Sequence, residues 1–258
     1  MKIAVCVKEV PAASRQLEHE SYRLDRGGDL RVNPRDLVAV EAALALGGDR
    51  ENEVVLVSVG PESAHETVRE GLAMGADRAV VVSDAALGGS DLAPTSLVLA
   101  RVLERERPEL TLFGQLAEDS AGGLIWAAVA VHLGLPILSQ ALMLAPAEGL
   151  VRIERQTEAG TDVLEAPLPC LVSVSDAIAV PRFPTFREMK AAREKPVQAL
   201  GLGDLGLSAD EVGDAGSLTE VLAASPVERS RDALVVEADE PAEAAREIAG
   251  FLRGRGLV

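Results

Sequence analysis

The sequence predicts an α/β fold in which helices cover both faces of a parallel β-sheet, followed by a β-hairpin and an extended C-terminal arm. The first observation is that short runs, apolar throughout, alternate with helical patterns as far as Pro136. Strands that are buried on both faces are typical of parallel sheets covered by helices. The second observation is a change beyond Leu150, where strand-like runs flank a turn, as they do in hairpins.

Length and charge limit the classes of protein to which the chain can belong. Its 258 residues, 48% of them hydrophobic, suit one large α/β domain with an appendage or two small domains. A net charge of −16 predicts a surface that repels nucleic acid and anionic membranes. No apolar run approaches the roughly 18 residues of a membrane-spanning helix. The chain begins directly with a strand, without a visible export signal, so we expect a cytoplasmic location.

Strands and helices are expected to alternate through the first half of the chain. The expected strands are Lys2–Val7, Glu53–Val59, Arg78–Ser83 and Leu110–Phe113, and the expected helices are residues 37–46, 64–74, 94–106 and a fourth that ends at Gly134. Asn33 or Asp36 is expected to cap the first helix. Ligands of parallel sheets bind beyond the carboxyl ends of the strands, which places a candidate site near Lys8 and Gly114.

A turn of small residues follows the fourth expected strand. It comprises Asp119, Ser120, Ala121, Gly122 and Gly123, at the point where the next helix is expected to begin. Backbone N–H groups at a helix start attract anions, above all phosphate, and glycine lets a ligand approach the main chain closely. We therefore predict that a nucleotide phosphate binds at this turn. Asp119 itself is either a nucleotide contact or a helix cap, and both alternatives stay open.

A hairpin and an arm are expected in the second half. Residues 151–156 and 162–165 form the expected hairpin, and residues 169–174 form another buried strand. Beyond Pro181 proline and glycine become frequent, and residues 187–230 lack the apolar density for a core of their own. We therefore divide the chain into a nucleotide-binding α/β domain, residues 1–186, and a C-terminal arm, residues 187–258, which ends with a strand at 233–237 and a helix at 241–253.

No catalytic or metal-binding motif is visible in the sequence. No Gly-x-Gly-x-x-Gly motif follows an expected strand, and the sequence contains neither a Walker-type lysine loop nor a nucleophile elbow. The three histidines are isolated, and His132 is expected to pack inside an apolar helix. Cys6 and Cys170 lie in apolar runs and are expected to be buried thiols. Arg35 either meets a flavin or a phosphate, or lies in solvent. The residues alone thus predict a nucleotide-binding α/β domain without catalytic machinery.

Several motifs resemble the beta subunit of electron transfer flavoproteins, over nearly the whole chain. The most specific is Glu66–Asp77, ETVREGLAMGAD. Further matches are Val5–Lys8, Asn33–Asp36 with Ala39–Ala43, Gly60–Pro61, Ile153–Arg155 with Glu158 and Leu168–Pro169, and Pro181–Phe183 through Met189–Ala191. The resemblance implies an adenine nucleotide hydrolase-like or Rossmann-like fold of three α/β/α layers.

The resemblance implies an electron carrier that is not itself an enzyme. The chain would form a heterodimer with an alpha subunit, which would hold most of the contacts to a redox-active FAD, while this chain would bind a structural AMP. Electrons would come from donor dehydrogenases and pass to a quinone-linked acceptor, and the arm would pack on the alpha subunit. The AMP site would comprise Cys6, Asn33, Pro34, Arg35, Asp36, Val59, Gly114, Ala117, Asp119, Ser120, Ala121, Gly122 and Gly123.

Two aromatic residues, Phe183 and Phe186, lie in a proline-rich segment. This segment resembles the loop through which the family contacts electron donors. We therefore predict that both rings belong to an exposed apolar docking patch. The alternative is that they fasten the arm to the core.

Two departures from the family's pattern keep other cofactors open. Leu116 and Leu124 stand where the family often has glutamine, which removes hydrogen bonds of about 1 kcal/mol each and weakens the expected AMP site. Asp84–Ser96 is similar to a loop of NADH-linked, electron-bifurcating members, which bind a second FAD in place of AMP. Leu92 and Pro94 interrupt that motif here.

Two further classes of protein are alternatives. One is a stand-alone adenine-nucleotide-binding regulator, similar to universal stress proteins in its sheet, although an uncovered arm would give such a protein no advantage. The other is a hydrolase that uses Glu118 and Asp119, for which both acids would have to converge on a phosphate without the help of a metal cluster.

Overall fold

The computed structural model describes residues 1–13, 17–18, 22–46, 52–225, 235–237 and 240–258. The chain divides into two compact units, Met1–Leu222 and Ala223–Val258. The first unit contains the sheet and the candidate site. Within the second unit, the described residues form one helix, α8 (Pro241–Gly254), which confirms the predicted C-terminal helix.

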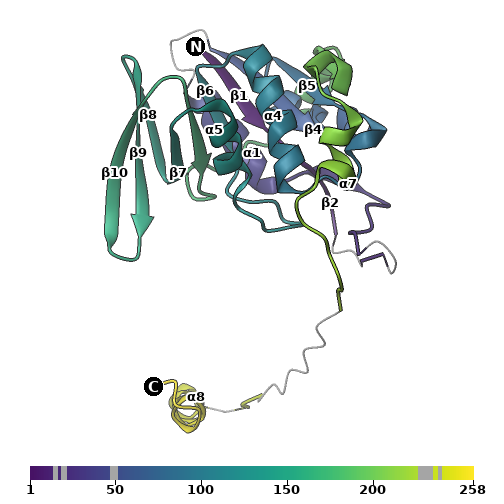
Figure 1. The fold of residues 1–258 in the computed structure, drawn as a ribbon. Coiled ribbons are helices and arrows are strands. Elements are labelled where there is room, and N and C mark those ends of the chain that lie inside the picture. Colours follow the sequence, from purple (N-terminus) through teal and green to yellow (C-terminus); the bar gives the residue numbers. More distant parts are fainter. Residues whose placement is uncertain (14–16, 19–21, 47–51, 226–234, 238–239) are drawn as a thin grey trace. The chain divides into compact units, whose positions relative to one another are not determined.

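A seven-stranded parallel sheet forms the centre of the first unit and confirms the predicted fold class (Figure 1). Its strands are β1 (Lys2–Cys6), β4 (Glu53–Val59), β5 (Arg78–Val82), β6 (Leu110–Phe113), β7 (Ile137–Ala141), β11 (Cys170–Val174) and β12 (Val197–Leu200), in the order β12-β5-β4-β1-β6-β11-β7. Strand β1 pairs with β4 on one side and with β6 on the other. The chain therefore reverses its direction of winding between β1 and β6, which is where ligands of open α/β sheets bind.

Helices cover both faces of this sheet. The helices α1 (Pro34–Ala45), α2 (Ala64–Thr67) and α3 (Arg69–Met74) contribute to the core on the face to which Ile3 and Val5 point. The helices α4 (Leu92–Glu106) and α5 (Ile125–Leu133) contribute to the core on the opposite face, which contains Ala4 and Cys6. Because successive side chains of a strand point to opposite faces, β1 holds the two cores together.

Two small antiparallel sheets are attached to the central one. Strands β8 (Met143–Ala147), β9 (Leu150–Thr157) and β10 (Gly160–Pro167) form the first, and they confirm the predicted hairpin. Val151 and Ile153 of β9 are fully buried and belong to the same core as α1. Strands β2 (Glu9–Pro11) and β3 (Leu30–Val32) form the second, at the carboxyl end of β1.

The division of the chain differs from the expected one at Arg187. After α6 (Phe186–Ala192), strand β12 adds to the sheet along β5, and residues up to Leu222 stay in the first unit. The short helices η2 (Leu202–Leu205), η3 (Ala209–Glu211) and α7 (Gly213–Gly216) follow, and Leu202, Leu207 and Val212 join the core beside α4. Gly201, Gly203 and Gly206 directly follow β12 with Gly-x-Gly-x-x-Gly spacing, so the expectation that no such motif follows a strand is wrong. The motif leads into the 3-10 helix η2 and not into the longer helix of a dinucleotide-binding unit. Of the strand expected at 233–237, the first two residues lie outside the described residues and 235–237 are not a strand.

Candidate functional site

The candidate site lies where β1 and β6 end and α1 begins. Lys8 follows β1, Asp36 lies in the first turn of α1, and Gly114 follows β6. The backbone N–H of Lys8 donates a hydrogen bond to Asp36 Oδ2 over 2.9 Å. These three sequence-predicted positions therefore meet at the edge where the chain reverses its winding.

Asn33 holds the loop after β6 in place instead of capping α1 with its side chain. Its Nδ2 donates to the carbonyl of Leu116 over 3.0 Å, and its Oδ1 accepts from the backbone N–H of Glu118 over 3.1 Å. Asn33 occupies the predicted N-cap position of α1, but its side chain makes no capping hydrogen bond to the helix backbone, and Asp36 lies inside the first turn. Asn33 is fully buried, and both ends of its amide are occupied by the protein. It acts on the site by positioning residues 116–118.

Gly114 packs directly against the start of α1. A Cβ at this position would lie 2.3 Å from Asp36 Oδ1 and 2.8 Å from the backbone carbonyl of Arg35. No side chain fits there without moving the helix. Burial raises the pKa of Asp36 to about 7, against the hydrogen bonds from Lys8 and Asn33. Asp36 is therefore a buried group that changes its charge near neutral pH.

Asp119 forms ion pairs with two basic side chains beside this contact. Lys8 Nζ donates to its Oδ1 over 2.8 Å, and Arg26 donates to its Oδ2. The Asp119 side chain is 3% exposed. Burial works against ionisation, but the hydrogen bonds and charges of Lys8 and Arg26 outweigh it and hold the pKa of Asp119 below its usual range. Asp119 thus fixes the loop by charge, and it caps no helix.

The turn at residues 120–124 differs from the predicted helix start. Helix α5 begins at Ile125, with Leu124 at the N-cap position, because Ala121 and Gly123 have left-handed φ values of 49° and 59°. The Ala121 N–H closes a turn on the carbonyl of Ala117 over 2.8 Å. In the described part of the chain, no acceptor is recorded for the N–H groups of Gly122 and Gly123. Successive N–H groups around left-handed residues form concave turns that bind anions.

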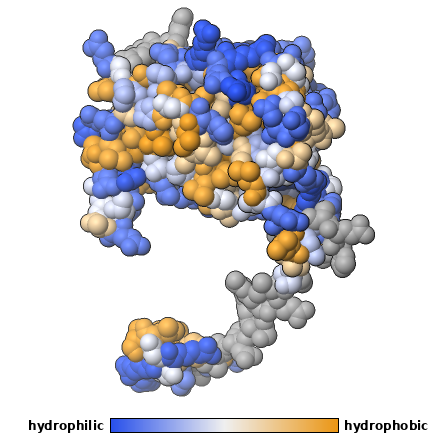
Figure 2. Space-filling view, in the orientation of Figure 1, coloured by the Kyte–Doolittle hydropathy of each residue, from blue (hydrophilic) through white to orange (hydrophobic). Residues whose placement is uncertain are grey.

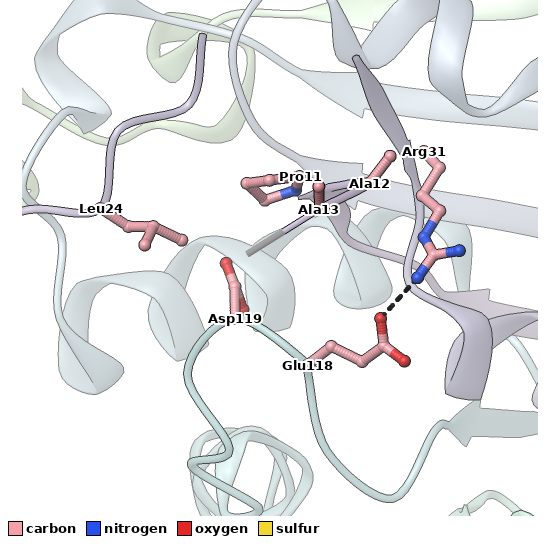
Figure 3. Close-up of a pocket in the computed structure, with 7 residues that line it drawn as sticks. All are labelled: Pro11, Ala12, Ala13, Leu24, Arg31, Glu118 and Asp119. Carbon is pink, nitrogen blue, oxygen red and sulfur yellow. Dashed lines mark hydrogen bonds and ion pairs between the residues drawn. The ribbon is translucent and has the colours of Figure 1, made fainter. Parts of the chain in front are cut away.

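Asp119 also lines an open cavity of about 340 Å³ (Figure 3). It is lined by Pro11, Ala12, Ala13, Leu24, Arg31, Glu118 and Asp119. An ion pair of 2.9 Å between Arg31 and Glu118 closes one side of it. The sequence analysis singled out Glu118 and Asp119 of this set and missed the residues of the β2–β3 sheet and its connection. The turn signal at 25–29 was visible, but nothing in it shows that this segment reaches the loop after β6.

The other predicted residues lie around this centre. Cys6 is buried beneath the site in the core on the α4 and α5 side, and burial raises its pKa, so it stays a thiol. Val59 ends β4 and is partly buried in the same core. Arg35 donates to Gln115 Oε1 over 2.7 Å and to Asp176 Oδ2 over 2.8 Å. The roles of these residues toward a ligand stay predictions.

Phe183 and Phe186 lie far out on the surface of the first unit. Their side chains are 95% and 79% exposed. The alternative that these rings fasten the segment to the core is wrong, because neither ring is buried. Arg182 holds the segment instead, through a bidentate ion pair of 2.7 Å with Glu41 on α1. Docking of an electron donor on the two rings stays a prediction.

No group of three or more His, Cys, Asp or Glu side chains among the described residues is placed to hold a metal ion. Likewise, none of the helices formed by the described residues has the length and apolar character needed to cross a membrane.

Comparisons with known proteins agree with the resemblance seen in the motifs. The model of the electron transfer flavoprotein domain family matches residues 23–205. The electron transfer flavoprotein subunit beta of Mycobacterium bovis is 38% identical over 233 residues, which cover 87% of this chain and 88% of that protein. The subunit beta of Megasphaera elsdenii is 34% identical over 231 residues, 86% of each chain. The caffeyl-CoA reductase-Etf complex subunit CarD of Acetobacterium woodii is 32% identical over 225 residues, also 86% of each.

Proposed function

The chain belongs to the electron transfer flavoprotein beta-subunit family, and we propose that it is the beta half of an electron-carrying heterodimer. An alpha subunit would hold most of the FAD, which supplies the redox chemistry when bound. This chain would bind AMP as a structural nucleotide. Electrons would arrive from donor dehydrogenases in the cytoplasm and leave to a quinone-linked acceptor. The observation that carries the proposal is the match of family and relatives over most of the chain.

The turn after β6 supports a bound adenylate. A Cβ added to Gly122 would meet no heavy atom within 4 Å, so the main chain is open to a ligand there. The N–H groups at Gly122 and Gly123 would hold the phosphate, which needs no glutamine side chain. Asn33 and Asp36 would act indirectly, because their side chains already hold the loop and the start of α1. The residues present therefore fit a mononucleotide phosphate held by the backbone.

The loop after β5 disfavours the alternative of a second FAD. In this chain Asp91 Oδ1 accepts from the Ala93 N–H over 2.9 Å, and its Oδ2 accepts from the N–H groups of Leu218 and Thr219 over 2.8 Å each. Ser217 Oγ also donates to the carbonyl of Gly89 over 3.0 Å. The chain's own residues thus occupy the start of α4, where a second dinucleotide would need room. A single FAD per heterodimer agrees better with this packing.

Co-expression with and without an alpha subunit tests the proposal against the stand-alone regulator. We expect the chain to purify as a one-to-one complex with the alpha subunit and to bring FAD with it. A stable monomer that retains adenine nucleotide and ignores the alpha subunit would instead support the regulator. Nucleotide released by denaturation and flavin absorbance are measured on the same samples, so the two cofactors are counted separately.

A further inference from the structure

A long stretch of the chain carries no formal charge. From Ser120 to Ala147 there is no Asp, Glu, Lys or Arg, although 26% of the whole chain is charged. A segment of this composition would be ordinary in a buried core. Depletion of charged residues on a surface is instead the compositional signal of the centre of a protein–protein interface.

Helix α5 leaves much of this uncharged stretch on the surface. Only Val129 and Ala130 are buried among its described residues, whereas Val131 is 82% exposed and Leu124, just before the helix, is 55% exposed. His132 is exposed as well, so its predicted place inside the core is wrong. Apolar side chains gather on the side of the molecule where α5 lies (Figure 2).

The apolar positions that reach the surface lie along one side of α5: Leu124 and Val131 are exposed, and Ala127 and Ala128 are half-buried. Leu124, Ala127, Ala128 and Val131 are spaced by three or four residues, which places them on the same helix face. Leu135 follows just past the end of the helix. We call these five residues the α5 face. A face of this kind, apolar and exposed, is a marker of an interaction site.

A second apolar feature continues the α5 face at its far end. Leu133 and Leu135 line an open hollow of about 340 Å³. Its other lining residues are apolar at Leu103, Pro108, Pro169 and Cys170, and polar or charged at Glu104, Arg107, Glu109 and Thr111. At its near end, Leu124 directly follows the turn at residues 120–123. The α5 face thus runs from the candidate site to a hollow that can receive an apolar side chain of a partner.

The net charge of the chain and the position of the α5 face indicate which partner can cover it. A second copy of the chain would bring another net charge of −16 against the first, and like charges oppose association. A partner that shares the cofactor must also reach the edge of the sheet at which the face begins. The alpha subunit is a different chain, so the repulsion between two identical acidic copies does not apply to it, and it would carry the FAD.

We propose that the α5 face and the hollow at its end form a docking surface for the alpha subunit. This inference rests on the proposed function and adds a contact surface to it, separate from the C-terminal arm. Val131 would lie near the middle of the contact, with the hollow beside it taking an apolar side chain of the alpha subunit. Because the α5 face carries no charged side chain, its burial against the alpha subunit would remove no charge from water.

Val131→Lys and Val131→Glu test the proposal, with Val163→Lys as the matched control. Val163 is an exposed valine on β10, outside the uncharged stretch. The full-length variants are titrated with the alpha subunit of the same organism, and the dissociation constant is measured. Both Val131 variants should bind about thirtyfold more weakly or worse, because either charge would be buried without a partner. The Val163 variant should bind like the wild type.

Each of the other outcomes overturns the proposal, and each points to a different conclusion about the α5 face. Wild-type affinity of both Val131 variants would show that the alpha subunit does not cover this face, while leaving the proposed function intact. A lower melting temperature of the isolated Val131 variants would show that the chain covers the face itself. A wild-type dimer that the Val131 variants dissociate would assign the face to a second copy. Failure of the wild type to bind the alpha subunit at all would overturn the proposed function together with this inference.

Discussion

Replacing Gly114 by alanine is the sharpest test of how the site is built. The added Cβ would lie 2.3 Å from Asp36 Oδ1 and 2.8 Å from the backbone carbonyl of Arg35. Backbone of the first turn of α1 cannot give way easily, because Val38, Ala39 and Val40 of the same helix are buried in the core. Asp36 in turn holds the Lys8 N–H over 2.9 Å. The substitution therefore strains the contact between the end of β6 and the first turn of α1, and neither segment can move away easily.

The expected cost has two parts. Overpacking of a close contact costs about 1–3 kcal/mol. Displacing Asp36 from the Lys8 N–H adds about 1 kcal/mol. The free energy of unfolding should therefore fall by roughly 2–4 kcal/mol, and the urea midpoint by about 1 M.

Gly122→Ala is the matched control for this experiment. No heavy atom lies within 4 Å of its added Cβ, and its φ is outside the left-handed range. Its free energy of unfolding should change by less than about 0.5 kcal/mol. Urea unfolding followed by circular dichroism compares the two variants with the wild type. If Gly114→Ala were as stable as Gly122→Ala, the end of β6 would not abut the start of α1, and the geometry of the candidate site would be wrong.

Four further substitutions test other parts of the account. Because the pKa of Asp36 rises from 3.8 to about 7 on folding, the stability that its protonated form contributes is complete below pH 3.8 and lost by pH 7. Relative to the wild type, the free energy of unfolding of Asp36→Asn should therefore increase by about 1.4 kcal/mol per pH unit between these two values. A difference between the two urea midpoints that does not change with pH would contradict this. Asn33→Ala leaves two partly buried backbone groups unpaired, the carbonyl of Leu116 and the N–H of Glu118, and should cost about 2 kcal/mol in thermal unfolding; no change would show that the loop keeps its conformation without Asn33. Asp119→Asn should cost about 1.5 kcal/mol at pH 7 and less below pH 3.8, because the pKa of this carboxyl is lowered in the folded state; an equal cost in acid would argue against the ion pairs. Phe186→Ala should slow electron transfer from donor dehydrogenases without a shift in melting temperature, whereas a large shift with normal transfer would refute docking.

Runs that are apolar throughout gave the most accurate sequence predictions. The ranges Glu53–Val59 and Leu110–Phe113 are the observed β4 and β6. A short apolar run of this kind is buried on both faces when it forms a strand of a parallel sheet covered by helices. Strand β12 was not predicted. It is four residues long, Gln198 interrupts its apolar pattern, and it depends on β5, its partner far away in the sequence. The extent of the first unit was misjudged for the same reason.

The candidate site was predictable in outline and not in its contacts. Gly114 and Asp119 were found from their place after a strand, because strand ends meet at one edge of a parallel sheet. The ion pair of Lys8 with Asp119 joins residues 111 positions apart, and no local pattern announces it. The helix start was placed too early because left-handed φ at Ala121, a residue with a Cβ, has no sequence signature.

The cofactor content of the purified heterodimer tests the central claim most directly. Chain and alpha subunit are co-expressed, the complex is denatured, and released FAD and AMP are separated and quantified against protein. The proposed function predicts one FAD and one AMP per pair of chains. Two FAD without AMP would contradict it, as would a complex that carries FAD but in which the site beside Gly122 and Gly123 takes no adenylate even when AMP is supplied.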